Sequence, residues 1–165
     1  MAKPYYEFFC PVKVIAGNAA LEHIPFELAT LGAKRPMIIT DKGVRANGLL
    51  GPIEAAFSTT DAVIGAIFDD VPPDSSLEVV RQAAELYRKQ NCDAIIAIGG
   101  GSVIDTSKAT NILVTEGGDD LPKFSGAHNL PKALKPFFVI PTTSGTGSEV
   151  TMVAVVSDLE KNVKM

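Results

Sequence analysis

Short apolar runs and amphipathic stretches alternate along this chain. Four of the apolar runs have the length of buried strands: residues 37–40, 63–68, 94–98 and 137–140. Between them lie stretches in which apolar residues recur at the spacing of a helix. Alternation of this kind predicts an α/β fold, in which helices cover both faces of a mostly parallel sheet.

The helical stretches carry boundary signals that sharpen this prediction. Ser75 and Glu78 have the spacing of a capping box at the start of the clearest helix, which is expected to run to Asn91. An earlier helix is expected between residues 18 and 32, where Pro25 removes an internal hydrogen bond. We therefore expect that helix to be kinked or divided into two short pieces.

The segment from Asp93 to Asp105 predicts a buried strand, followed by three glycines and the start of a helix over 102–115. Glycine lets the backbone approach a ligand closely, and the first turn of a helix has free N–H groups, so this pattern is typical of a phosphate site. The alternative is a plain helix cap built from Ser102 and Asp105. A cap does not need three glycines. The residues favoured for a pyrophosphate are Gly99, Gly100, Gly101 and Ser102.

A second polar segment, rich in hydroxyl side chains and glycine, directly follows the apolar run 137–140. It could be an ordinary turn, but residues that follow a buried strand lie at the sheet edge where open α/β sheets bind ligands. Two such loops suit a dinucleotide better than a nucleoside triphosphate, since neither glycine cluster is followed by the lysine of a P-loop. The candidate contacts are Thr142, Thr143, Ser144, Gly145 and Thr146.

Composition and charge argue against several classes of protein, including nucleic-acid-binding and membrane-spanning ones. The 165 residues are expected to form one domain, and a net charge of -4 argues against a nucleic-acid partner. Apolar runs fall short of the roughly 20 residues that span a bilayer, and the N-terminus lacks a signal-peptide pattern. Cys10 and Cys92 lack metal-ligand spacing, which favours reduced thiols. We expect a cytoplasmic protein.

The two loops in this order, with Asp41 ending the first core strand, resemble the paired signature of the iron-dependent alcohol dehydrogenases over essentially the whole chain. The resemblance implies a Rossmann-like, dehydroquinate synthase-like N-terminal domain that binds NAD. In the family, a helical domain with an Asp and three His follows and binds iron or another divalent metal. That domain is absent from these residues, and His23 and His128 do not match its ligands, so no catalytic or metal-binding residue is assigned.

The resemblance also implies roles for single residues. Residues 100–102 fall where the cofactor's phosphates bind, and Asp105 falls near the nicotinamide end, which leaves it open between a cap and a site. Asp41 would accept from the adenosine ribose and repel a 2′-phosphate, so NAD is favoured over NADP, with a plain turn residue as the alternative. Lys164 matches a position that contacts the cofactor, and a solvated charge is the alternative.

The family's activity is reversible hydride transfer between a short-chain or primary alcohol and NAD, with the aldehyde as product. We expect this chain to be a truncated piece, inactive without the metal-binding half. The alternatives are a stand-alone nucleotide-binding module or remnant, or half of a glycerol dehydrogenase or maleylacetate reductase. Family similarity also implies a homodimer through an opening strand or hairpin over 6–16. Its exposed aromatic residues would be Tyr5, Tyr6, Phe8 and Phe9.

Overall fold

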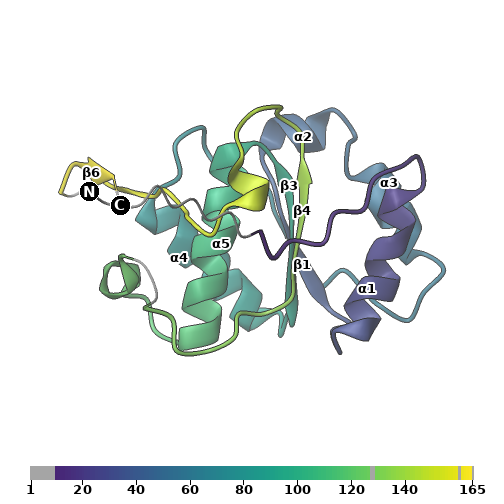
Figure 1. The fold of residues 1–165 in the computed structure, drawn as a ribbon, viewed down its shortest axis with the longest axis horizontal. Coiled ribbons are helices and arrows are strands. Elements are labelled where there is room, and N and C mark those ends of the chain that lie inside the picture. Colours follow the sequence, from purple (N-terminus) through teal and green to yellow (C-terminus); the bar gives the residue numbers. More distant parts are fainter. Residues whose placement is uncertain (1–9, 127–128, 160, 165) are drawn as a thin grey trace, which may run out of the picture.

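The computed structural model of the protein describes residues 10–126, 129–159 and 161–164. A four-stranded parallel sheet lies at its centre, with the strand order β2-β1-β3-β4 (Figure 1). The strands are β1 (Pro36–Ile39), β2 (Ala66–Phe68), β3 (Ala94–Gly99) and β4 (Phe137–Pro141). The predicted α/β class is therefore confirmed. Two short antiparallel strands, β5 (Ser157–Asp158) and β6 (Val163–Lys164), form a separate small sheet.

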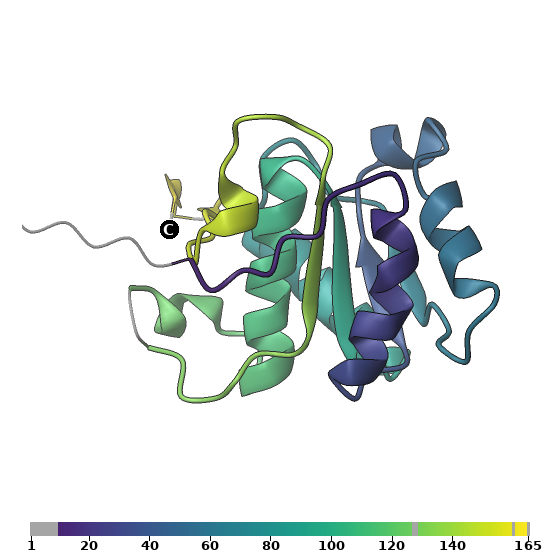
Figure 2. The same ribbon diagram turned by 45° about the vertical axis from the view of Figure 1, so that its right-hand side comes forward.

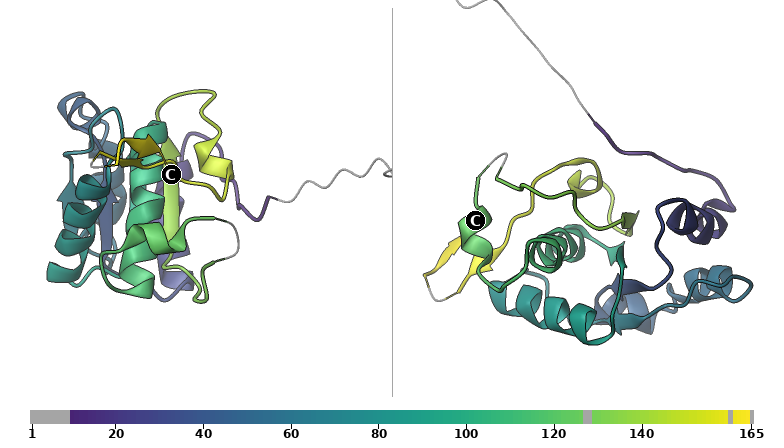
Figure 3. Two further views of the ribbon diagram at one scale, coloured as in Figure 1. Left: turned by 90° about the vertical axis from the view of Figure 1, so that its left-hand side faces the viewer. Right: turned by 90° about the horizontal axis from the view of Figure 1, so that it is seen from below.

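Helices cover both faces of the central sheet, as Figures 2 and 3 show. Those on one face are α1 (Ile24–Thr30) and α3 (Gly51–Phe57), and those on the other are α4 (Leu77–Lys89) and α5 (Gly101–Glu116). The central strands β1 and β3 are apolar on both faces because both faces are buried, whereas the edge strands β2 and β4 are mostly half-buried. Ile38 and Ile96 pack toward α1 and α3, while Met37 and Ile95 pack toward α4 and α5.

Shorter elements complete the fold. These are α2 (Lys42–Ala46) and the 3₁₀ helices Ala20–His23, Leu121–Phe124 and Ser148–Val150. The first helical region consists of a 3₁₀ turn followed by α1, with Pro25 in the first turn of α1, so the prediction of two short pieces is confirmed. No helix of the described residues is long and apolar enough to cross a membrane.

Two predictions about local structure are wrong. Ser76, and not Ser75, is the N-cap of α4, and its hydroxyl accepts from the Val79 N–H. Ser75 turns instead toward α5, where its hydroxyl lies 2.7 Å from that of Thr106. The described part of the opening segment, residues 10–16, is neither helix nor strand. Pro11 removes a donor there. Tyr5, Tyr6, Phe8 and Phe9 lie outside the described residues.

Candidate functional site

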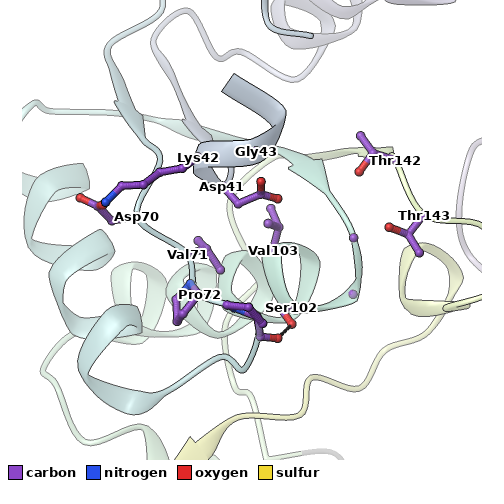
Figure 4. Close-up of a pocket in the computed structure, with 13 residues that line it drawn as sticks. Asp41, Lys42, Gly43, Asp70, Val71, Pro72, Ser102, Val103, Thr142 and Thr143 are labelled. Atoms are coloured by element: carbon purple, nitrogen blue, oxygen red, sulfur yellow. Dashed lines mark hydrogen bonds and ion pairs between the residues drawn. The ribbon is translucent and has the colours of Figure 1, made fainter. Parts of the chain in front are cut away.

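The chain changes direction across the sheet between β1 and β3. From β1 it runs outward to β2, and then it returns to place β3 on the other side of β1. In open α/β sheets such a switch point leaves a crevice at the carboxyl ends of the strands. A groove of about 650 Å³ opens there (Figure 4). The segments that follow all four strands line it: residues 41–43, 70–73, 100–103 and 142–143.

Helix α5 begins at this groove without an intervening loop. Gly100 is its N-cap and has no side chain with which to cap the helix. The N–H groups of the first turn, from Gly101 to Val103, therefore have no carbonyl partner within the helix. Because 16 residues of aligned peptide dipoles stand behind them, these groups favour a bound anion at this end of the groove.

The three glycines before and within the first turn meet different surroundings. A Cβ on Gly99 would lie 2.5 Å from Val103 Cγ2, and one on Gly100 would lie 2.8 Å from Thr143 Oγ1. A Cβ on Gly101 would meet only ordinary contacts, the nearest at 3.6 Å from Thr146 Cβ. The first two positions are thus glycine because neighbouring protein atoms approach closely, whereas Gly101 has room for a Cβ and lines the groove.

Ser102 and Asp105 do not form the helix cap that was the alternative interpretation. The Ser102 hydroxyl donates to the Pro73 carbonyl and thereby joins α5 to the turn that follows β2. Asp105 accepts from the Ser148 hydroxyl at 2.6 Å and from the Val155 N–H at 3.1 Å. Both residues line a second cavity of about 240 Å³, and Ser102 lines the groove as well.

Lys108, one turn beyond Asp105 on α5, is a half-buried cation that sequence reasoning missed. Its Nζ donates to the Val153 carbonyl at 2.7 Å and to the Ser148 hydroxyl at 3.1 Å. Burial lowers the pKa of Lys108, and the charges of Asp105 and Glu149 oppose that shift. Together the lysine and Asp105 fasten residues 148–155 against α5. The available signal was the three-residue spacing, which places both charges on one helix face.

Two roles were considered for Asp41, a turn residue and a cofactor contact, and its position is compatible with both. Its Oδ1 accepts from the Val44 N–H at 2.8 Å, so it is the N-cap of α2, and the same residue lines the groove. Beside it, Lys42 Nζ lies 2.7 Å from Asp70 Oδ1 across the groove's edge. The hydrogen bond and charge of Asp70 raise the pKa of Lys42.

The turn after β2 contributes Asp70, which sequence reasoning also missed. A signal was present in the sequence, because this polar turn follows a strand directly. The carboxyl ends of parallel neighbours meet at one edge of a sheet, and β2 pairs in parallel with β1. The turn therefore had to lie beside Asp41.

The hydroxyl-rich segment after β4 reaches the groove only at its start. Thr142 and Thr143 line the groove, whereas Ser144, Gly145 and Thr146 line neither cavity. Thr146 is used locally, since its hydroxyl donates to Glu149 Oε2 at 3.2 Å and accepts from the Ser148 N–H at 3.3 Å. Gly145 has a φ of 86°, which glycine adopts readily and which turns the chain away after Thr143.

Lys164 lies on β6, at the second cavity, and not in the larger groove. Its Nζ is 3.3 Å from Asp74 Oδ1 in an exposed ion pair. The cavity that it lines with Ser102 and Asp105 adjoins the groove, because Gly101 and Ser102 belong to both.

The described residues hold no group of three or more His, Cys, Asp or Glu that could bind a metal ion. His23 is exposed at the end of a 3₁₀ turn, and His128 lies outside the described residues. Cys10 and Cys92 are free thiols. The residues that the structure describes therefore do not supply the donors for the divalent metal that the resemblance implies.

Comparison with known proteins gives one consistent family. Residues 11–165 match the sequence model of iron-containing alcohol dehydrogenase. The chain is 35% identical over 159 residues to the NAD-dependent methanol dehydrogenase of Bacillus methanolicus, covering 96% of this chain and 41% of that protein. The chain spans about two fifths of the length of the curated relatives that it matches.

Solved structures of other proteins contain the same fold as this chain. The chain is similar to 1,3-propanediol oxidoreductase, with a TM-score of 0.89 and 32% identity, over 98% of this chain and 42% of that one. It is also similar to sulfoacetaldehyde reductase from Bifidobacterium kashiwanohense in complex with NAD+, with a TM-score of 0.84 and 27% identity. That match covers 98% of this chain and 42% of the reductase.

Proposed function

The chain belongs to the iron-containing alcohol dehydrogenase family, and from that premise we propose that it forms the NAD-binding half of an NAD-linked alcohol dehydrogenase. The reaction proposed for the whole enzyme is reversible hydride transfer between a short-chain or primary alcohol and NAD. A relative that is an NAD-dependent methanol dehydrogenase supports this choice of cofactor and substrate class. The homodimer implied by the family remains part of the proposal.

The observation that carries the proposal is the open anion site at the start of α5, inside a groove at the sheet's switch point. The N–H groups of Gly101 and Ser102 would bind the pyrophosphate there. Asp41, after β1, would accept hydrogen bonds from the adenosine ribose. The nicotinamide end would extend toward Thr142 and Thr143, or toward the adjoining cavity at Asp105.

The chemistry proposed for this chain is confined to the cofactor. NAD accepts or supplies the hydride when it is bound, and the protein's part is to hold it in a fixed orientation. The β3–α5 junction, where a single residue separates the strand from the helix, is suited to that task. The family's iron does not fit the described residues, so no step of the proposal depends on a metal in this chain.

Calorimetric titration with NAD and NADP tests the proposal, using the wild type and Asp41→Gly. We expect NAD to bind more tightly than NADP to the wild type, because the Asp41 carboxylate opposes a 2′-phosphate. Asp41→Gly should weaken NAD binding by about 1.5–3 kcal/mol, the usual range for a hydrogen bond to a charged group. The same change should improve NADP binding.

Asp41→Asn is the matched control, since it keeps an oxygen for the Val44 N–H and removes only the charge. It should shift the preference toward NADP without loosening α2. A wild type that binds neither cofactor would contradict the proposed function. Tight NAD binding combined with no turnover in any longer form of the protein would favour the alternative, a non-catalytic nucleotide-binding module.

A further inference from the structure

Helix α2 carries two cations, and each is paired with an aspartate of the turn that follows β2. Lys42 Nζ lies 2.7 Å from Asp70 Oδ1, and Arg45 Nη1 lies 2.6 Å from Asp69 Oδ2. Only the first pair borders the groove, where Figure 4 shows the Lys42 side chain extended toward Asp70. Lys42 is the one cationic residue among the described residues that line the groove.

We propose that Asp70 is a second determinant of cofactor choice, because it occupies the ammonium group with which a 2′-phosphate would otherwise pair. This inference rests on the proposed function and deepens it. A phosphate monoester carries close to two negative charges at neutral pH. At this end of the groove it would meet the Asp41 carboxylate and a lysine whose charge is already paired with Asp70.

Selectivity for NAD is then shared between two residues that act differently. Asp41 opposes the 2′-phosphate directly by like charge. Asp70 acts through Lys42, which immediately follows Asp41 in the chain and is held by its ion pair toward the β2 turn. Removing Asp41 alone would leave that lysine paired, and this predicts that a change of cofactor preference is incomplete until Asp70 is changed as well.

The expected effect is modest because the pair is exposed to solvent. The Lys42 and Asp70 side chains are 80% and 58% exposed, and exposed ion pairs contribute little. We expect Asp70→Asn to raise the affinity for NADP relative to NAD by about two- to fivefold. The change should shrink at high salt, since mobile ions screen exposed charges.

The experiment measures the ratio of NADP to NAD affinity by calorimetry at low and high salt. Asp69→Asn is the matched control, because it removes the same charge from the adjacent residue but releases Arg45, which does not line the groove. A double-mutant cycle with Lys42→Met separates release of the lysine from simple loss of negative charge. If the effect passes through Lys42, Asp70→Asn should change the ratio in the wild type and not in Lys42→Met.

Three results would overturn the inference. These are a ratio that does not move in Asp70→Asn, an equal change in Asp69→Asn, and an equal change in the Lys42→Met background. All three leave the proposed function intact, because NAD still binds. A wild type that binds neither cofactor instead overturns the proposed function, and this inference with it.

Discussion

The glycines at the β3–α5 junction allow structural and functional roles to be separated residue by residue. Gly101→Val should abolish measurable NAD binding, because a branched side chain would fill the space in front of the free N–H groups. Its cost in fold stability should be small, since a Cβ at this position meets nothing closer than 3.6 Å. Calorimetry and thermal unfolding on the same sample measure the two effects.

Gly99→Ala is the opposite case, since its new Cβ would lie 2.5 Å from Val103 Cγ2. We expect a loss of about 1–3 kcal/mol in the free energy of unfolding, as for other overpacked cores. Gly51→Ala, where a Cβ meets nothing within 4 Å and the residue is helical, should not lower stability or change binding. Unchanged NAD affinity in Gly101→Val would mean that the glycine run is purely structural.

Cys92 gives the fold a dependence on alkaline pH. Burial raises the pKa of this thiol from 9.0 to about 11, and burial also raises the pKa of the neighbouring Tyr87 hydroxyl. The folded chain therefore keeps a proton that the unfolded chain loses above pH 9. The stabilising contribution is complete below that pH and is lost as the pH rises through about 11.

Denaturant unfolding between pH 7 and pH 11 should thus show a free energy of unfolding that falls above about pH 9. Cys92→Ala should make that fall shallower, whatever its effect at neutral pH. Cys10→Ala should leave the slope as it is in the wild type, because Cys10 is outside the core. Equal slopes in the wild type and Cys92→Ala would contradict the prediction.

Among the elements, α5 does more than cover the sheet, because its Lys108 and Asp105 hold residues 148–155. Lys108→Met keeps much of the side chain's length but removes the donor shared by Ser148 and the Val153 carbonyl. We expect faster amide hydrogen exchange across 148–155 and a loss of about 1–2 kcal/mol in the free energy of unfolding.

Lys132→Met is the control, because that lysine is exposed and its ion pair with Glu116 is loose, at 3.8 Å. Similar exchange in both variants would show that the segment is held by other contacts.

The elements that sequence could predict are those whose apolar pattern comes from burial. All four strands of the sheet lie where apolar runs were found, and the pattern is strongest in β1 and β3, which are buried throughout and therefore have to be apolar throughout. Helix α2, with five residues, is too short to show a periodic pattern. The cap of α4 is displaced by one residue because Ser75 and Ser76 are chemically equivalent, and only the contact with Thr106 distinguishes them.

The same reasoning explains which parts of the candidate site could be predicted. Gly100, Gly101 and Asp41 could be placed at this edge of the sheet because each lies within two residues of the end of a buried strand. Asp70 was missed because its place beside Asp41 depends on the parallel pairing of β1 with β2. Thr146 lies outside the lining of the groove, after a positive φ at Gly145, and its role as a cofactor contact stays a prediction.

On the scale of the whole molecule, one architectural feature creates the groove. The segments that line it follow four different strands, so the groove exists only when the sheet order β2-β1-β3-β4 is complete. Exposed apolar side chains concentrate elsewhere, in residues 12–15 and 150–163. The start of the second segment lies near the first, since the Cys10 thiol is 3.8 Å from the Val150 carbonyl oxygen.

The last prediction concerns the whole chain and separates cofactor binding from catalysis. We expect the 165-residue chain to bind NAD but to hold no stoichiometric iron or zinc and to show no turnover of ethanol with NAD. A tight transition-metal site needs three or four converging donors, and the chain contains only two histidines. Those of its potential donors that the structure describes do not converge in groups of three or more.

Metal analysis after dialysis, NAD calorimetry and an assay of NADH formation should be made on one preparation. One tightly held metal ion per chain would contradict the ligand argument, and turnover at a rate typical of enzymes would contradict the expectation that these 165 residues are inactive by themselves. Loss of NAD binding would instead contradict the proposed function, so the three measurements distinguish three different errors.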